Sequence, residues 1–247
     1  MIHLIAFARI SGKQYAYDYV VSDNEIDKVI QKQNKMIETS SEEAKELFTT
    51  HVIKAQEGTF KDIQKKDPYF SHTILCESFE SFLSAVNSET KLSAKDVASY
   101  LLRRFKEFNN RRFALHKVLY YIYADYLVKN RYPLFSADFV AFDKGPVEYD
   151  IYRMEKYQKN QLLSNHSFEL KVQLLPDCHD VLQLIKDDVD KYEDYYQDIW
   201  STYRSNNPNY NITHKNGTPW YVARNRGRNS SIKDADIVKY HKIEVLN

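Results

Sequence analysis

Residues 113–130 read FALHKVLYYIYADYLVKN, a stretch in which apolar side chains recur every three or four positions. That spacing predicts a helix packed against a core, with a polar edge along one side. The same spacing predicts a second, longer helix from residue 177 to residue 204. Together the two helices indicate a mainly helical fold. The apolar stripe of the first helix consists of Leu115, Val118, Leu119, Ile122 and Tyr126.

The start of the chain has a different pattern, in which apolar and polar side chains alternate. The segments HLIAFARI (3–10) and QYAYDYVV (14–21) flank a glycine-containing turn at 11–13, which predicts a β-hairpin. One of these two segments is expected to present an exposed strand edge. A helix is predicted next, behind Ser22 or Asp23 as its cap. Its apolar positions are Ile26, Val29, Ile30 and Ile37.

The pattern changes after a polar segment at residues 87–92, where Ser93 caps the next predicted helix. We place a boundary near residue 90. The sequence therefore predicts residues 1–90 as a small α+β extension and residues 91–247 as a helical domain. The fold class is mainly α with short β elements (α+β). Between the long helices we predict a strand at 138–142, a turn at 144–146, a helix at 147–158 and a strand at 168–175, and a last helix behind Ser230 or Ser231.

Composition excludes several classes of protein. The chain has 35 basic and 34 acidic side chains, so no overall charge attracts it to nucleic acid or to anionic lipid. Its five glycines form no phosphate-binding loop, which excludes the common nucleotide-binding enzymes. No histidine or cysteine pair has the spacing of metal ligands, so we expect neither a metal nor a cofactor. No apolar run approaches the ~18 residues of a membrane span, and a cytoplasmic protein is expected.

Two groups of polar residues are candidates for function. His116 and Lys117 precede Tyr120 and Tyr121 within a helix that is predicted to be buried. His116 is either a histidine at the edge of the core, satisfied by a neighbouring backbone group, or part of a polar network that reaches a partner. Three arginines lie near Trp220 and Tyr221 in the sequence. This combination also suits a site that binds single-stranded nucleic acid through base stacking and phosphate contacts. These arginines are Arg224, Arg226 and Arg228.

Three segments occur in a characteristic order: LHKVLYYIYADYLVKNRYPLF (115–135), FDKGPVEYDIY (142–152) and THKNGTPWYVAR (213–224). Together they resemble the Panacea domain, also called the SocA-like or GepA-like phage-associated domain. The resemblance covers residues 93–245, and Val118 and Thr218 are mild departures from the family pattern. The matching residues are Leu115, Lys117, Leu119, Tyr120, Tyr121, Leu127, Gly145, Pro146, Val147, Tyr152, His214, Gly217, Pro219, Trp220, Ala223 and Arg224.

This resemblance implies a mostly helical antitoxin of a toxin–antitoxin system. Such proteins bind a co-encoded toxin directly, and some deliver it to a protease; the toxins include alarmone-synthetase-like enzymes. The motif residues, with His116 beside them, are then expected to bind a partner or to hold the fold, and no catalytic residue is predicted. Residues 1–90 fall outside the resemblance and are expected to set partner specificity. The alternatives are a nucleic-acid-binding regulator of its own operon, a phage-defence-associated regulator, and an enzyme built on His214 and His116.

The segment THKNGTPWYVARNRGRN (213–229) is the most unusual part of the chain. Asn216-Gly217 is expected to form a turn and Pro219 to fix the backbone after it. Trp220 has an apolar body to bury and one N–H to satisfy, with His214 and Arg224 on either side as polar partners. We therefore expect that the main role of this segment is to stabilise the fold, and that contact with a partner is its secondary role.

Overall fold

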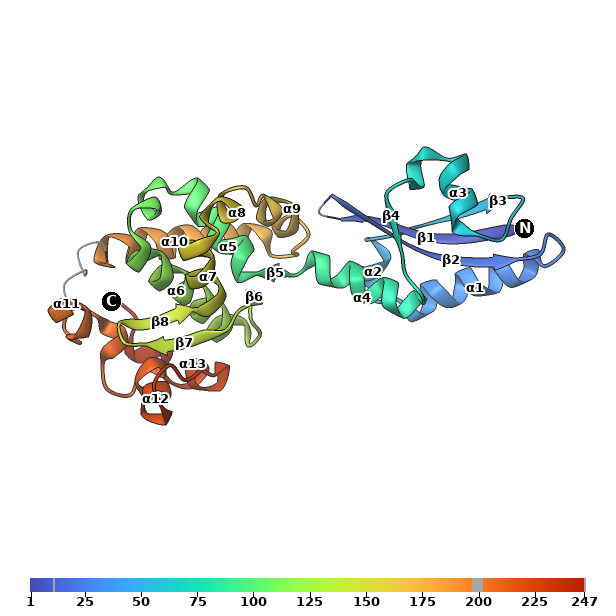
Figure 1. Cartoon of the computed structure of the whole chain (residues 1–247). Helices are drawn as coiled ribbons and strands as arrows, with labels where there is room; N and C mark the ends of the chain where they lie inside the picture. Colours follow the sequence, from blue (N-terminus) through green and yellow to red (C-terminus); the bar gives the residue numbers. More distant parts are fainter. Residues whose placement is uncertain (11, 197–201, 247) are drawn as a thin grey trace. The chain divides into compact units, whose positions relative to one another are not determined.

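The computed structural model describes residues 1–10, 12–196 and 202–246 (Figure 1). The chain divides into two compact units, Met1–Lys91 and Leu92–Asn247, one residue from the boundary expected near residue 90. Helices predominate, and the strands form one four-stranded and two two-stranded sheets. The predicted fold class, mainly α with short β elements, is confirmed.

The first unit is built on a sheet with the strand order β3-β1-β2-β4. β1 (Ile2–Ile10) and β2 (Lys13–Val21) pair antiparallel, which confirms the hairpin; Ser11 of its turn lies outside the described residues. β3 (Thr49–Lys54) pairs antiparallel with β1, and β4 (Thr73–Leu75) pairs parallel with the start of β2. The expectation of an edge at β1 or β2 is therefore wrong: these are the central strands, and β3 and β4 are the edges.

Both faces of this sheet are covered, because β1 alternates apolar side chains toward each face. α1 (Ile26–Thr39) and α4 (Phe79–Thr90) pack on Leu4, Ala6 and Ala8. α3 (Phe60–Lys66) and a 3-10 turn at Pro68–Phe70 pack on Ile5 and Phe7 of the opposite face (Figure 1). A short helix, α2 (Glu42–Lys45), is capped by Ser41. The cap of α1 is Glu25 rather than the predicted Ser22 or Asp23.

The second unit surrounds α6 (Arg112–Asn130). This helix contacts α5 (Ala94–Arg104), α10 (Cys178–Tyr196) and α13 (Asp234–Tyr240). Every residue from 114 to 124 is buried, so the predicted polar edge is absent over this stretch. A helix enclosed on all sides must satisfy its polar side chains internally, and α6 carries a histidine, a lysine and three tyrosines within those positions.

A hairpin packs beside α6 and carries one of the three motifs. β7 (Phe139–Phe142) pairs antiparallel with β8 (Gly145–Glu148), and Phe142 faces Gly145. The turn is therefore Asp143-Lys144, and Pro146 and Val147 lie in β8 rather than in the turn and helix predicted for them. α7 (Tyr149–Tyr157) begins two residues later than expected, capped by Glu148, whose Oε2 accepts the N–H of Ile151 at 2.7 Å.

The remaining elements complete the enclosure of α6. The 3-10 turn Ile212–His214 leads to α12 (Pro219–Arg226), which contacts β7. The predicted helix 177–204 appears as α10, which ends at Tyr196, and α11 (Thr202–Asn206); residues 197–201, including Ile199, lie outside the described residues. α13 is capped by Lys233 rather than Ser230 or Ser231. The other elements are α8 (Lys159–Leu163), α9 (Ser167–Val172), β5 (Leu92–Ser93), β6 (Phe135–Ser136) and a 3-10 turn at Lys106–Asn109.

The predicted strand at 168–175 is wrong, because residues 167–172 form α9. Phe168, Leu170 and Val172 alternate as in a strand, but Phe168 and Val172 also have the i, i+4 spacing of one helix face. Both of these residues are buried, whereas Leu170 is 53% exposed. Three alternating positions are too few to distinguish the two-residue period of a strand from the 3.6-residue period of a helix.

This difference is testable by substitution. Phe168→Ala should lower the free energy of unfolding by ~3–5 kcal/mol, as truncation of a buried phenylalanine does. Leu170→Ala should change it by no more than about 0.5 kcal/mol, the usual effect of a surface substitution. Urea unfolding of both variants measures this contrast. Equal large losses would indicate that the two residues share one buried face, as in a strand.

Candidate functional site

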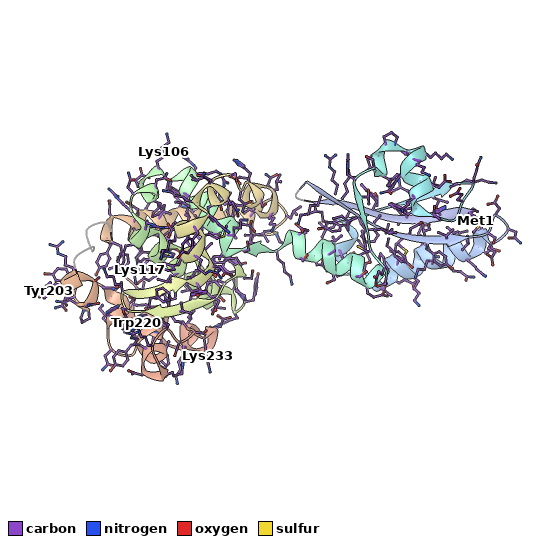
Figure 2. All side chains as sticks on the ribbon, in the orientation of Figure 1. Met1, Lys106, Lys117, Tyr203, Trp220 and Lys233 are labelled. Atoms are coloured by element: carbon purple, nitrogen blue, oxygen red, sulfur yellow. The ribbon has the colours of Figure 1, made fainter. Side chains whose placement is uncertain are left out.

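The centre of the site is Lys117, a lysine that is only 1% exposed on α6 (Figure 2). Its Nζ donates to the carbonyl oxygen of Lys144, at 2.8 Å, and to Oγ1 of Thr213, at 3.2 Å. Both acceptors are uncharged. The rings of Phe113 and Tyr196 lie 5.0 and 5.8 Å from the same nitrogen. Burial holds the pKa of Lys117 well below its ordinary value, against the weaker pull of the Glu244 carboxylate.

Gly145 leaves the space that the lysine needs. Its φ is +114°, a conformation that side chains rarely adopt, and an added Cβ would lie 1.6 Å from Nζ of Lys117. Asn211 completes the arrangement: its Nδ2 donates to the Lys144 carbonyl at 3.1 Å, and its Oδ1 accepts from Thr213 at 2.7 Å. We call Lys117, Gly145, Asn211, Thr213 and the Lys144 carbonyl the Lys117 node. The node joins α6, the β7–β8 hairpin and the segment before α12.

Trp220 ties α12 to the same hairpin (Figure 2). The indole is 8% exposed, and its Nε1 donates to the carbonyl oxygen of Phe142 at 2.8 Å. The His214 ring stacks on it at 3.7 Å with an interplanar angle of 8°. Burial, together with the positive charges of Lys117 and Arg224, lowers the pKa of His214 to about 3, so this ring is neutral at pH 7.

The backbone around Trp220 explains the residue types in this motif. Gly217 has a φ of +82°, which glycine adopts without strain. Thr218 caps α12 by accepting the N–H of Tyr221 at 3.2 Å, and its hydroxyl donates to the carbonyl of Thr213 at 2.6 Å. Pro219 occupies the first turn of the helix, where its missing N–H costs nothing.

Arg224 connects the motif to the surface. Its guanidinium donates to the carbonyl of Ala141 at 3.2 Å and pairs with Asp143, which also pairs with Arg228 at 3.2 Å. These arginines hold the pKa of the Asp143 carboxyl below its ordinary value. The side chains of His214, Trp220 and Arg224 line an open depression together with Asp143, Asn206 and Arg228.

His116 belongs to a separate cluster. Its Nε2 lies 2.8 Å from Oε2 of Glu155 on α7, and Arg112 pairs with the other oxygen of that carboxylate at 3.5 Å. The ring of Tyr152 lies 6.3 Å from the histidine ring. Within the described part of the chain, no interaction connects His116 with His214.

Tyr120 and Tyr121 bind the C-terminal segment. The Tyr120 hydroxyl donates to Oε1 of Glu244 at 2.6 Å, and the Tyr121 hydroxyl donates to the Glu244 carbonyl at 2.9 Å. His241 lies 2.9 Å from the same Glu244 carboxylate and 2.8 Å from Asp125 on α6. Sequence reasoning missed Asn211, Glu244, His241 and Asp125, because each is an isolated polar residue with no periodic or motif signal.

His241 and Asp188 are two buried groups near Asp125 whose pKa values are raised in the folded protein. Burial lowers the pKa of His241, but its hydrogen bonds to Asp125 and Glu244 outweigh burial and raise it to about 9. Burial and the nearby Asp125 carboxylate raise the pKa of Asp188 to about 9 as well. At pH 7 the folded protein therefore holds protons here that the unfolded chain does not.

Several side chains near the motifs reach the surface on one side of the hairpin. On α7, Tyr149, Tyr152 and Tyr157 are 45%, 41% and 71% exposed. Phe142 lies 6.5 Å from the ring of Tyr149 and 5.2 Å from that of Tyr152. The next residue, Asp143, carries the arginine pair. We call Phe142, Tyr149, Tyr152, Tyr157, Arg224 and Arg228 the tyrosine–arginine face.

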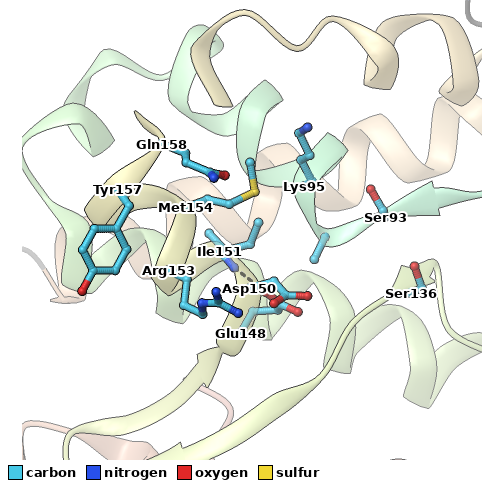
Figure 3. A pocket seen from close by; sticks show the side chains of 11 residues that line it. Ser93, Lys95, Ser136, Glu148, Asp150, Ile151, Arg153, Met154, Tyr157 and Gln158 are labelled. Atoms are coloured by element: carbon cyan, nitrogen blue, oxygen red, sulfur yellow. Dashed lines mark hydrogen bonds between the residues drawn. The ribbon is translucent and has the colours of Figure 1, made fainter. Parts of the chain in front are cut away.

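This face borders a pocket of about 390 Å³ between the start of α5 and α7 (Figure 3). Lys95 and Arg153 provide cations to its lining, Asp150 a carboxylate, and Met154 and Tyr157 apolar surface. The described residues include no cluster of three or more His, Cys, Asp or Glu that could hold a metal ion.

No family model, curated protein or solved structure matches the chain. Among the helices of the described residues, none has the length and apolar character needed to cross a membrane. The three motifs and the geometry around them consequently carry the functional argument.

The first prediction from this geometry concerns Trp220. Trp220→Ala should reduce the free energy of unfolding by ~3–5 kcal/mol, since it removes a buried ring. Trp220→Phe should cost less, about 1–3 kcal/mol, because it mainly leaves the Phe142 carbonyl without its donor. Urea unfolding measures both variants. An unchanged urea midpoint for Trp220→Ala would show that this residue does not stabilise the fold.

The second prediction concerns pH. Because His241 has a pKa of about 9 when folded and ~6.5 when unfolded, its stabilising contribution is complete below pH ~6.5 and is lost as the pH rises toward 9. The pKa of Asp188 is also raised in the folded protein, so its titration likewise lowers the unfolding free energy as the pH rises. Unfolding free energy should therefore fall between pH 6.5 and 9, and His241→Gln should flatten this slope.

His179→Gln is the matched control, because His179 is an exposed histidine on α10. This variant should keep the wild-type slope. If the unfolding free energy of His241→Gln falls as steeply with pH as that of the wild type, His241 is not the source of the pH dependence.

Proposed function

We propose that this protein is an antitoxin that neutralises a co-encoded toxin by direct protein–protein binding. The proposal rests on the three ordered motifs, which resemble those of the Panacea domain. An alarmone-synthetase-like enzyme in the cytoplasm is one toxin class in keeping with this resemblance. Delivery of the bound toxin to a protease would be a further step of the same mechanism.

The observation that carries the proposal is the division between buried and exposed motif residues. Lys117, Gly145 and Trp220 make internal contacts, and among the described residues no nucleophile paired with a base contacts them. The exposed aromatic side chains near the motifs are Tyr149, Tyr152 and Tyr157 of the tyrosine–arginine face. Tyrosine and arginine are enriched among the residues that dominate the binding energy of protein interfaces. A binding role therefore fits the site better than catalysis.

The nucleic-acid alternative fits the geometry less well. A stacking clamp needs an exposed aromatic face, but Trp220 is 8% exposed and its ring is covered by His214. The arginines of this segment are paired with carboxylates: Arg224 and Arg228 with Asp143, and Arg226 with Asp236.

Co-expression with each reading frame adjacent to the gene tests the proposal. The wild-type chain should restore growth and bind the toxin. The double variant Tyr149→Ala/Tyr152→Ala should weaken binding at least ~30-fold, as loss of interface hot spots of ≥2 kcal/mol does. Tyr132→Ala alters a tyrosine that is 56% exposed and packs against Tyr126 rather than against a residue of this face, and it should leave binding unchanged.

A wild-type chain that fails to protect against any neighbouring toxin would overturn the antitoxin proposal. If the double variant binds as tightly as wild type and unfolds at the same urea midpoint, the toxin uses another surface. Hydrolysis or transfer chemistry in the purified protein, abolished by His214→Ala, would support the enzyme instead.

We further propose that residues 1–91 select which toxin is bound, while the second unit supplies the scaffold and the tyrosine–arginine face that contributes binding energy. Specificity is a difference between affinities, and it is set by residues that are free to vary rather than by those that hold the fold. A chain of residues 92–247 should keep its helical circular dichroism yet lose protection. Protection equal to that of the full chain would place specificity within the second unit.

A further inference from the structure

The backbone groups of the edge strand β3 point alternately toward β1 and away from it, and the hydrogen bonds show which residues point away. Met1 and Ala55 exchange both of their backbone hydrogen bonds, each at 3.0 Å, next to the β1–β3 ladder. In an antiparallel ladder such pairs alternate with residues whose N–H and C=O point away from the neighbour. Thr50, Val52 and Lys54 therefore direct these groups outward. The Lys54 carbonyl agrees with this phase, because it accepts Nζ of Lys66 rather than a group of β1.

The position of α1 across the sheet is fixed by two side chains. Nζ of Lys32 lies over the rings of Tyr17 and Tyr19 on β2, at 5.2 and 5.4 Å. Nε2 of Gln33 donates to Oγ1 of Thr50 on β3 at 2.8 Å. One flank of α1 therefore lies toward β2, and the flank that carries Gln33 lies toward the β3 edge.

An apolar stripe follows that second flank. Ile26 and Ile30 are seven and three residues before Gln33, and Ile37 is four residues after it. At these spacings all three side chains lie on the same side of the helix as Gln33. They are 46%, 52% and 42% exposed, whereas Val29 carries the buried face of α1. Val52 is 53% exposed and points to the same sheet face as Thr50, since side chains alternate along a strand. Outward-pointing backbone groups and exposed apolar side chains thus lie along one border of the first unit.

We propose that this border is a homodimer interface in which β3 pairs antiparallel with β3 of a second copy. A two-fold axis through Val52 places it opposite the second copy's Val52 and places Thr50 opposite the second copy's Lys54. All three residues with outward backbone groups are then paired, and no like charges face each other. The two four-stranded sheets become one continuous sheet.

The same symmetry explains the apolar stripe. An axis perpendicular to the sheet keeps both α1 helices on one face and makes them antiparallel. Ile30 and Ile37 of one copy then meet the corresponding stripe of the other, which removes exposed apolar area from water. A foreign strand would satisfy the backbone edge but would leave the isoleucine stripe without a matching helix. The inference concerns self-association and does not depend on the antitoxin proposal.

Sedimentation equilibrium of the purified full chain, without any toxin, tests the dimer. The wild type should have twice the monomer mass. Val52→Lys should raise the dimer dissociation constant at least ~100-fold, because it sets like charges opposite each other across the axis. Ile30→Lys should dissociate the dimer through the helix stripe. Ile74→Lys, which alters a residue with 52% exposure on the opposite edge strand β4, should remain dimeric.

A monomeric wild type would overturn the proposal, as would dissociation by Ile74→Lys equal to that by Val52→Lys. Urea midpoints close to wild type for all three variants would show that lost association is not lost folding. If the wild type is monomeric alone and Val52→Lys instead abolishes toxin binding, the edge belongs to a toxin strand.

Discussion

The second unit depends on the enclosure of one lysine amine within its core. Lys117 lies on a helix that is buried on every side, so its N–H groups need acceptors inside the protein. The acceptors come from the turn of the β7–β8 hairpin and from the segment before α12, which are 27 and 96 residues away in sequence. Glycine is required at position 145 because any Cβ there would collide with the amine. Two of the three motifs and the start of the third thus meet at one nitrogen.

The position of the surface follows from this arrangement. The hairpin that accepts Lys117 also offers the Phe142 carbonyl to Trp220, and Asp143 in its turn pairs with two arginines. α7 begins where β8 ends and carries the tyrosines outward. The most characteristic residues are therefore internal, and they hold in place the hairpin and the helix that carry the exposed side chains.

The elements that the sequence predicted well are those whose residues interact locally. The helix around residues 113–130 and the first hairpin follow from periodicity, and Ser93 is predicted from the local sequence as the cap of α5. The strand β3, by contrast, reads TTHVIK and gains its partner 42 or more residues away, so no local signal distinguishes it from a loop. The sequence of α9 predicts a strand instead of a helix, because so short an alternation of apolar residues fits the period of either element.

The site was predictable only in part for a related reason. The motifs identified Lys117, Gly145 and Trp220, but not the interactions among them. Asn211 and Glu244 are single polar residues whose burial is decided by tertiary packing, with nothing in their neighbours to mark them. The pocket beside α7 likewise arises from segments more than 40 residues apart.

A double-mutant cycle between positions 117 and 145 tests the central claim most directly. Lys117→Met keeps most of the alkyl chain and removes the amine, while Gly145→Ala adds the Cβ that would meet it. The backbone strain at Gly145 is present in both backgrounds and cancels in the cycle. If the lysine fixes the hairpin, Gly145→Ala should cost less unfolding free energy in the Lys117→Met background, with a coupling energy on the order of 1–3 kcal/mol. Costs that add within about 0.5 kcal/mol would contradict the account.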